Sequence, residues 1–560
     1  MDNDYEHLKL CQGQKGLFRN EISQEEVIEI IARYPTSLWL DLFSKIDGFL
    51  TIPRGRDFDP QKFLAENLFC PSALERTKRP ANSNSVFFTY GQLNLLRKLA
   101  IVYGNDSNQT EIEKIDISKV LLATQDIHND YDSFVHTGEY ENFCKSVLRN
   151  GYLNGVTDQA TLFYRAKKMY VDQSAKLPIY PNQTFDDFFR QRVGLIPQDA
   201  LSLNFALATP FFQTMETFWG QTAILPTNYF GLTEIDQAQI NSIIDSMTID
   251  FAVIKDALTR EIHKKKLGEL PVGYGLSAFR KTPLVRLPDG RLVCVNLPCL
   301  FEKSTQNAIW MPTKGSSGTD RQTLVNHLTH YRGLLFEEYL KELCSIMISK
   351  NQKLSFKHIP PEATVDHEEV GDSILIQGNK LIIFEAKSRQ FLEPFKMTGN
   401  WEKDQTFITT FVEASQQVET AATKIRSRKI TGLNIDPNNI EKIYPVIVTY
   451  EPVPMHGKLQ RLIRQKVAEA GYLTDAIFAP LEVMTIDDIE RSLDAVDTIT
   501  LVELLDEKNS GIPHASEANF HNFVSQYVST YTVLSSGWQA EQVERTWREV
   551  FQPYFRDKFK

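Results

Sequence analysis

The sequence predicts an α/β C-terminal core, a mixed sheet flanked by helices, together with a large, mainly α-helical N-terminal domain and a helical C-terminal tail. Three observations predict this. Apolar residues recur at helical spacing from about residue 20 to 265, two short β-type runs flank a turn within residues 283–296, and helix and strand patterns alternate within residues 325–490. Such alternation is typical of a sheet covered by helices.

The N-terminal region begins with a clear helix signal. SQEEVIEIIARY places Ser23 three residues before Glu26, which is the pattern of a capping box. TYGQLNLLRKLAIVYG and FDDFFRQRVGL repeat apolar residues at spacings of three and four. We therefore expect residues 1–265 to form a mainly helical recognition or regulatory domain.

A connector is predicted over residues 266–324. In PLVRLPDGRLVCVN two β-type runs flank Pro288, Asp289 and Gly290, which favour a tight turn, so we expect a hairpin. The polar stretch PTKGSSGTD follows at residues 312–320 and is predicted to be a loop. It lacks the Gly-Lys-Ser/Thr ending of a phosphate-binding loop, so it does not predict nucleotide binding.

The α/β pattern occupies residues 325–505, and residues 506–560 are predicted to be a helical extension in which QAEQVERTWREVFQPYF is the plainest helix. The expected elements of the core, in order, are a helix (about 325–349), a hairpin (372–388), a long helix (about 406–428), a strand (444–450), a helix (457–470), a strand (481–486) and the helix DDIERSL.

Composition narrows the class of protein. The chain has 560 residues, of which 42% are hydrophobic and 24% charged, as in ordinary globular proteins. Its formal net charge of −10 excludes a surface coated in basic residues, so nucleic acid would have to bind local patches. The polar N-terminus does not look like a secretory signal, the six cysteines are scattered, and no apolar run approaches the roughly 18 residues of a membrane span. We therefore expect a cytoplasmic protein that does not bind membranes.

One stretch, VGDSILIQGNKLIIFEAKSRQF at residues 370–391, combines ionisable residues with apolar runs. If Gly378 and Asn379 form a two-residue hairpin turn, Asp372 faces Glu385 across the hairpin. Directly opposed residues have Cβ atoms roughly 4.5–5.5 Å apart on one face of the sheet. Lys387, two residues beyond Glu385, projects from the same face.

Two opposed carboxylates repel each other, and a bound divalent cation reverses that effect. Oxygen-only ligands favour Mg²⁺ or Mn²⁺ over zinc, so the expected cofactor is Mg²⁺ (or Mn²⁺) held by Asp372 and Glu385. Such an ion polarises a phosphodiester and lowers the pKa of a bound water. Lys387 would orient that water, help to deprotonate it, or neutralise the transition state.

These residues resemble the signature of the PD-(D/E)xK nuclease superfamily, the restriction-endonuclease-like fold. The resemblance covers about residues 325–490 and rests on Asp372 and on Glu385-Ala386-Lys387. It implies an αβββαβ core and metal-dependent hydrolysis of nucleic acid, with an endonuclease acting on DNA as the expected case. The residue before the aspartate is Gly371, where the family motif has proline.

The same resemblance implies two further site residues. An acidic residue from the preceding helix often joins the metal site, and RGLLFEEYLKEL makes Glu337 the preferred candidate, with Glu338 as the alternative. Many members carry a glutamine on the following helix. EASQQVETAATKI is similar, with Gln417 preferred over Gln416.

The basic residues and the resemblance both indicate binding partners. Two basic clusters could contact phosphates without reading sequence, and the six residues are Lys424, Arg426, Arg428, Lys458, Arg461 and Arg464. This fold often pairs two protomers to cut both strands, which implies a homodimer or higher oligomer. A nuclease core fused to a helical region looks like prokaryotic anti-phage defence proteins, in which the helical domain would bind a substrate, activator or other protein partner.

Each candidate also has an ordinary structural explanation. The hairpin could expose a solvated polar face, Lys387 could form a surface ion pair, and Glu337, Gln417 and the basic clusters could simply face water. His327 and His330 lack further ligands at zinc spacing, so a zinc site is not expected there. The competing functions are a non-catalytic nucleic-acid-binding or assembly protein that keeps the fold as scaffold, and a helical interaction protein.

Overall fold

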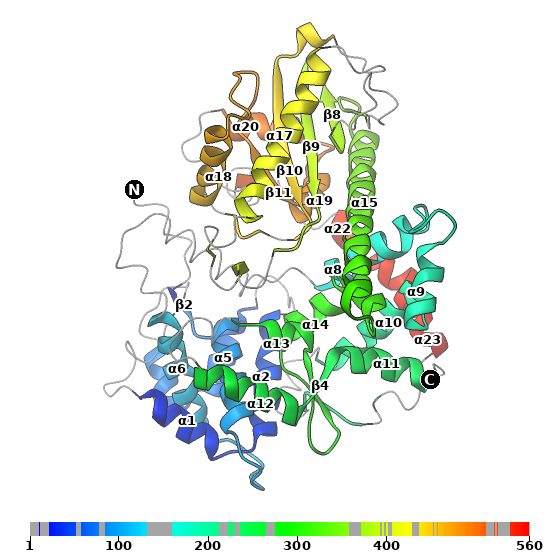
Figure 1. Ribbon diagram of the computed structural model, residues 1–560. Helices are drawn as coiled ribbons and strands as arrows, with labels where there is room; N and C mark the ends of the chain where they lie inside the picture. Colours follow the sequence, from blue (N-terminus) through cyan, green and yellow to red (C-terminus); the bar gives the residue numbers. More distant parts are fainter. Residues whose placement is uncertain are drawn as a thin grey trace. The chain divides into compact units, whose positions relative to one another are not determined.

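The chain forms two compact units in a computed structural model (Figure 1). The first unit comprises Met1–Phe163, Val193–Met311 and Tyr554–Lys560, and the second comprises Tyr164–Arg192 and Pro312–Pro553. The structure describes residues 10–11, 22–51, 58–77, 85–130, 159–211, 222–227, 229, 236–264, 275–357, 371–391, 395–396, 399–400, 406–427, 436–451, 453–455, 457–510, 520, 523–524 and 538–558.

The described part of the first unit is mostly helical. Its helices are α1 (Gln24–Ala32), α2 (Thr36–Thr51), α3 (Pro60–Leu68), α4 (Pro71–Thr77), α5 (Tyr90–Tyr103), α6 (Lys114–Asp130), α10 (Pro197–Ala208), α11 (Gln237–Met247), α12 (Phe251–Lys264), α13 (Ser277–Lys281) and α14 (Leu297–Ser304). The predicted capping box is confirmed at the start of α1, where Ser23 Oγ accepts from Glu26 N at 3.2 Å and Glu26 Oε2 accepts from Ser23 N at 3.0 Å.

Two sheets accompany these helices. The predicted hairpin is confirmed as the antiparallel pair β5 (Leu284–Arg286) and β6 (Leu292–Cys294), and Gly290 adopts φ +85° in its turn. It lies inside a four-stranded mixed sheet of order β3-β6-β5-β4, which the sequence did not predict. The remaining strands are β3 (Ile224–Leu225), β4 (Thr248–Asp250) and the parallel pair β1 (Leu10–Cys11) and β2 (Ser85–Val86).

A buried ion pair fixes the core of the first unit. Arg97 Nη2 on α5 lies 2.7 Å from Asp47 Oδ1 on α2, and both side chains are fully buried. Burial raises the pKa of Asp47, while Arg97 and the backbone N–H of Leu297, which donates to Asp47 Oδ2 at 2.8 Å, act in the opposite direction. The carboxyl therefore ties together α2, α5 and the first residue of α14.

The second unit is built on a five-stranded mixed sheet of order β11-β10-β9-β8-β7. β8 pairs antiparallel with β7 and β9, while β10 pairs parallel with β9 and β11. The strands are β7 (Ser355–Lys357), β8 (Ser373–Gln377), β9 (Lys380–Lys387), β10 (Lys442–Thr449) and β11 (Glu482–Thr485). The helices that accompany them are α15 (Gly318–Lys350), α17 (Thr406–Arg426), α18 (Gly457–Glu469), α19 (Ile486–Ala495) and α20 (Leu501–Lys508).

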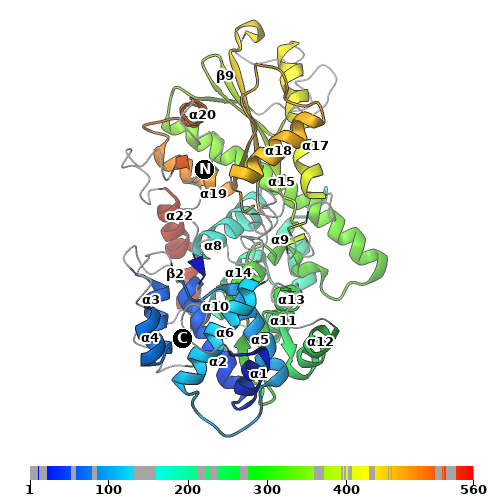
Figure 2. The ribbon, with the colours of Figure 1, turned by 90° about the vertical axis from the view of Figure 1, so that its left-hand side faces the viewer.

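The predicted helices and strands of this core are found in the predicted order, but β7 and α20 were not among them, and α15 begins at Gly318, inside the stretch predicted to be a loop. Helices cover both faces of the sheet: α17 and α18 lie on one side, and α19 and α20 on the other (Figure 2). Alternate side chains of the hairpin pack under α17. The buried residues of this layer are Ile374, Ile376, Leu381 and Ile383 from the strands and Val418, Ala421, Ala422 and Ile425 from α17.

Residues Tyr164–Arg192 group with the second unit, although they precede the core by more than a hundred residues. This segment includes the end of α8 (Gln159–Lys167), the π-helix η3 (Lys168–Gln173) and most of α9 (Phe185–Val193). It packs along α15, where Tyr331 Oη donates to the carbonyl of Leu177 at 2.7 Å.

A second buried ion pair fastens this segment to the core. Arg165 Nε and Nη2 donate to the two carboxylate oxygens of Glu490 on α19 at 2.7 and 2.6 Å. Glu490 is fully buried and also accepts from Tyr339 Oη on α15 and from Gln539 Nε2, each at 2.8 Å. Gln539 belongs to α22 (Trp538–Thr546) of the predicted helical extension, which continues through π-helix η8 (Trp547–Phe551) to α23 (Gln552–Lys558).

Two general expectations can be compared with the described residues. None of their helices has both the length and the apolar character needed to cross a membrane. The cysteines whose state is described, Cys70, Cys294, Cys299 and Cys344, are free and buried.

We predict that Arg165→Met will lower the free energy of unfolding of the second unit by about 3–5 kcal/mol, because it leaves the carboxylate of Glu490 buried without its cation. Urea denaturation followed by circular dichroism would measure this loss.

Arg545→Met on α22 is the matched control. Arg545 also pairs with a glutamate, Glu549, at 3.0 Å, but the two side chains are 65% and 57% exposed, so water screens the pair. No measurable change is expected for this variant. Equal effects of the two substitutions would contradict the role assigned to Arg165.

Candidate active site

The hairpin of β8 and β9 has the predicted register. Gly378 and Asn379 form the turn, with Gly378 at φ +59°, and Ser373 pairs with Phe384. Continued by one residue, this register sets Asp372 opposite Glu385. The turn favours glycine at its first central position, which needs positive φ.

The two acidic residues lie on the α17 face of the sheet. They follow the same alternation as Ile374 and Ile383, which pack under α17. Both acids line a cavity of about 280 Å³. Its other lining residues are Gly371, Gln416, Gln417 and Thr420.

Lys387 turns its amine towards this site. Its Nζ lies 2.6 Å from Glu385 Oε1 and donates to Gln417 Oε1 on α17 at 2.7 Å. The structure therefore brings together three of the predicted residues, Glu385, Lys387 and Gln417, in one hydrogen-bonded chain. Gln417 is exposed on the helix surface, and its contact with Lys387 distinguishes it from an ordinary surface glutamine.

Asp372 is held by the backbone of the neighbouring strand. Its N–H donates to the carbonyl of Phe384 at 3.2 Å, and its Oδ2 accepts from the N–H of Ala386 at 2.5 Å. One carboxylate oxygen is thus held by the sheet, which orients the group.

Gly371 allows this geometry. It adopts φ +57°, a left-handed conformation that is closed to proline, whose ring fixes φ near −65°. A Cβ added here would lie 3.3 Å from Ile383 Cγ2 and 3.7 Å from the Cβ of Ala421. The departure from the proline of the family motif therefore has a structural reason: the chain turns sharply beneath α17 before Asp372.

The electrostatics of the site suit a cation. Asp372 and Glu385 are only 8% and 4% exposed, and the side chain of Lys387 is 22% exposed. Two buried carboxylates side by side repel each other and are costly to bury unless cations neutralise them. Oxygen donors of this kind fit Mg²⁺ or Mn²⁺, and Mg²⁺ is commonly held by one or two carboxylates together with waters and substrate phosphates.

Glu337 does not complete a three-ligand group. It is half-buried on α15, one helical turn after Gly333, and a Cβ added to Gly333 would lie 3.7 Å from Ser388 Oγ. Among the residues that the structure describes, no three acidic, histidine or cysteine side chains come together as a metal site. Glu338, the alternative, pairs with Lys341 at 2.7 Å. The metal role of Glu337 stays a prediction.

The end of β9 is fixed from both sides. The backbone N–H of Tyr450 donates to the carbonyl of Lys387 at 3.1 Å, and the buried guanidinium of Arg332 on α15 donates to the carbonyl of Ser388. Phe336 packs edge-on against Tyr450 with ring centroids 5.4 Å apart. The backbone that carries Lys387 is therefore rigid.

The residues of the predicted basic clusters have varied surroundings. Lys424 is buried, and Arg426 pairs with Asp475 at 2.8 Å. Arg464 donates to the carbonyl of Leu481 at 2.8 Å and also pairs with a buried glutamate of β11. These contacts give each side chain a structural role, so their contact with phosphates stays a prediction.

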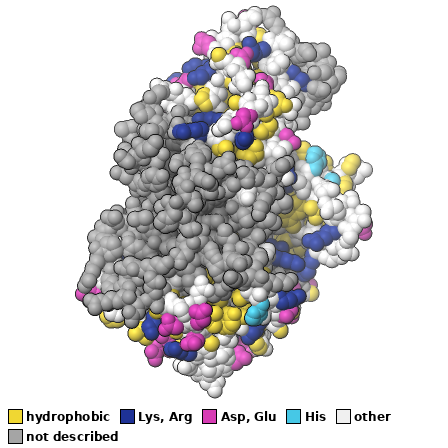
Figure 3. All heavy atoms as spheres, turned by 60° about the vertical axis from the view of Figure 1, so that its left-hand side comes forward, with side chains coloured by type: hydrophobic (Ala, Val, Ile, Leu, Met, Phe, Trp, Pro, Cys, Tyr) yellow, Lys and Arg dark blue, Asp and Glu magenta, His cyan; other side chains and the backbone are white. Residues whose placement is uncertain are grey.

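The remaining basic candidates give no further indication of phosphate contact. Arg461 is exposed on α18, Lys458 lies on the same helix but its side chain is not described, and Arg428 lies outside the described residues. On the face drawn in Figure 3, basic and acidic side chains of the described residues alternate. That face carries no continuous basic surface among the residues it colours.

Gln416 and Thr420 line the cavity and were not singled out as a pair from the sequence. Their spacing could have identified them. Residues three and four apart share one face of a helix, and Gln417, three residues before Thr420, was already a candidate on that face. Thr420 Oγ1 donates to the carbonyl of Gln416 at 2.8 Å, so its lone pairs remain acceptors towards the cavity.

Three comparisons with known proteins found no relative: no family model, no curated protein and no solved structure matches the chain. The functional argument therefore depends on the geometry of the site and on the resemblance of its residues.

We predict that Gly371→Ala will lower the free energy of unfolding by about 1–2 kcal/mol, because the left-handed conformation is unfavourable for a residue with a Cβ. Gly378→Asn is the control: nothing lies within 4 Å of its added Cβ, and asparagine tolerates positive φ. Thermal melts of both variants would measure the effect. A loss in Gly378→Asn equal to that in Gly371→Ala would contradict this explanation.

We also predict that the chain binds one Mn²⁺ ion through the two opposed carboxylates. Isothermal titration calorimetry should show affinity at least about tenfold weaker, or about 1.4 kcal/mol, for Asp372→Asn and for Glu385→Gln. Glu413→Gln, an exposed residue of α17 that does not line the cavity, should bind as the wild type does. Unchanged binding in both carboxylate variants would exclude this metal site.

Proposed function

We propose that the protein is a metal-dependent nuclease that hydrolyses phosphodiester bonds, with DNA as its substrate and Mg²⁺ (or Mn²⁺) as its cofactor. The observation that carries this proposal is the arrangement of Asp372, Glu385 and Lys387 on one face of a hairpin, beside Gln417 and at the wall of one cavity. Ordinary folding gains nothing from two buried carboxylates placed in this way.

Each residue of the site would have its own role in the reaction. Asp372 and Glu385 would hold the ion, which when bound polarises the phosphate and acidifies a water. Lys387 can orient the attacking water through its Nζ or stabilise the charge of the transition state. Gln417 holds the amine by accepting from it, so the position of Nζ depends on α17 as well as on β9.

The core topology supports the resemblance to the restriction-endonuclease-like fold. α15, β7, β8, β9, α17 and β10 follow one another in the αβββαβ order that the resemblance implies. The candidate residues occupy the positions of the family motif at the start of β8 and the end of β9. We assign the chain to that superfamily as part of this proposal.

The biological setting follows from the cysteines and from analogy. Free buried cysteines suit a reducing, cytoplasmic compartment. By analogy with nuclease cores joined to helical regions, the function would be prokaryotic defence against phage or foreign DNA. The mainly helical first unit would then bind a substrate, activator or other protein.

One observation favours an alternative function, that of a non-catalytic scaffold. The described residues provide two carboxylates and no grouped third ligand, as in a nucleic-acid-binding or assembly protein that retains a nuclease-like fold as scaffold. Such a protein would bind nucleic acid without cutting it.

Purified protein should convert supercoiled plasmid to nicked or linear DNA in Mg²⁺ or Mn²⁺ and lose this activity in chelator. Lys387→Met should lower the cleavage rate about 10²–10⁴-fold, since the amine acts in the chemical step. Its Mn²⁺ affinity should equal or exceed that of the wild type, because the amine no longer competes for Glu385.

Single-stranded DNA and RNA belong in the same assay to identify the substrate. Glu413→Gln on the exposed surface of α17 should cleave at the wild-type rate. Binding of nucleic acid with no metal-dependent cleavage would favour the scaffold. Cleavage that survives Asp372→Asn, Glu385→Gln and Lys387→Met would reject this active site.

A further inference from the structure

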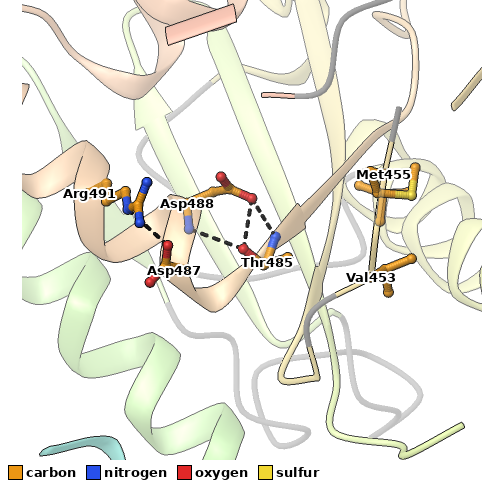
Figure 4. Close-up of a pocket in the computed structure, with 7 residues that line it drawn as sticks. Val453, Met455, Thr485, Asp487, Asp488 and Arg491 are labelled. Carbon is orange, nitrogen blue, oxygen red and sulfur yellow. Dashed lines mark hydrogen bonds and ion pairs between the residues drawn. The ribbon is translucent and has the colours of Figure 1, made fainter. Parts of the chain in front are cut away.

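A second cavity lies where β11 passes into α19 (Figure 4). Its volume is about 160 Å³, below the roughly 300–1,000 Å³ of pockets that hold drug-sized ligands. Val453, Met455 and Val483 give it apolar walls, and Thr485 and Asp488 add polar groups. The space suits a single small ring system with one polar edge.

Strand register places this cavity beside the candidate active site. Thr449 on β10 pairs with Lys387 on β9 and with Thr485 on β11, so the three residues stand abreast at the ends of parallel strands. In-register residues of neighbouring strands share a face, and two strand spacings amount to about 10 Å. The cavity and Lys387 therefore lie at the same end of the sheet.

The polar wall contains an available acceptor. Asp488 Oδ2 accepts from both the N–H and the hydroxyl of Thr485 at 2.8 Å. No described residue donates to its second oxygen, which points away from Thr485 in Figure 4. Burial raises the pKa of Asp488 to about 6, so above that pH the group is ionised and accepts hydrogen bonds only.

The neighbouring charges are already paired. Asp487 lies 2.8 Å from Arg491 and 2.6 Å from Arg165. Burial acts to raise the pKa of Asp487, but the two guanidinium groups hold it below its ordinary value. The acceptor offered to a ligand is consequently Asp488, faced across the cavity by Met455 and Val453 (Figure 4).

We propose that this cavity binds one unstacked nucleobase that carries an exocyclic amino group, in the strand whose phosphate is cut beside Lys387. The proposal rests on the proposed nuclease function and deepens it by assigning a base-recognition subsite. Apolar walls would stack on the ring, and the carboxylate of Asp488 would accept from the amino group. The two strand spacings between Thr485 and Lys387, about 10 Å, correspond to at most about three stacked nucleotide steps of 3.4 Å each. The base therefore lies close to the cleaved phosphate.

Sequencing of cleavage ends from random-sequence substrates at pH 8 tests this subsite. Wild-type protein should prefer adenine, cytosine and guanine over thymine by about tenfold at one fixed position near the cut, because a site built to accept a hydrogen bond rejects a base without the donor. Met455→Phe, which fills the cavity, should reduce this preference below about twofold. Met455→Leu, of similar size, should keep the preference.

Asp488→Asn gives the sharper result. Its amide oxygen can still accept from Thr485, while its amino group now faces the cavity as a donor. The preference should therefore move towards thymine and guanine, which carry a carbonyl oxygen at the position where cytosine and adenine carry the amino group. An even base distribution with wild-type protein, or a preference that neither Met455→Phe nor Asp488→Asn changes, would overturn the subsite.

Direct binding separates failure of the subsite from failure of the nuclease. Saturation-transfer NMR of the full chain with cytidine and uridine 5′-monophosphates should show contact for the cytosine ring in the wild type and none in Met455→Phe. Absent cleavage with this contact retained would reject the nuclease and keep the base site. Cleavage without the contact, and without base preference, would reject the base site alone.

Discussion

The pairing of β8 with β9 through Gly378 and Asn379 is the constraint on which the candidate site depends. Side chains alternate along a strand, so a shift of register by one residue would send either Asp372 or Glu385 to the opposite face of the sheet. Two independent features oppose such a shift: the two-residue turn, and the apolar layer of the hairpin beneath α17. The packing that stabilises the sheet thus also forces two carboxylates together.

Neighbouring groups orient the site residues around that pairing. Asp372 is fixed by the N–H of Ala386 and Lys387 by Gln417 and Glu385, while Gly371, which has no side chain, favours the left-handed conformation just before Asp372. The site is therefore preorganised by backbone geometry and by one helix, which is the condition under which electrostatic catalysis is effective.

The sequence was sufficient for features encoded locally. The two-residue turn signal at Gly378 and Asn379 specified the register of the hairpin, and the alternation of helix and strand patterns specified the order of the core elements. The sequence was insufficient for contacts between residues that are far apart along the chain. Arg165 contacts Glu490 in this way, so no local pattern could place Tyr164–Arg192 in the second unit. Lys424 and Arg464 show the same limit, because their charge was visible but the groups that bury or pair them were not.

The central claim is that a divalent cation sits between Asp372 and Glu385. Anomalous diffraction from crystals soaked in Mn²⁺ tests it most directly, because the signal locates the ion itself. The account predicts an anomalous peak within about 2.0–2.2 Å of an oxygen from each carboxylate, on the α17 face of the sheet. A well-ordered hairpin without a peak at that position, or with manganese bound only elsewhere, would contradict it.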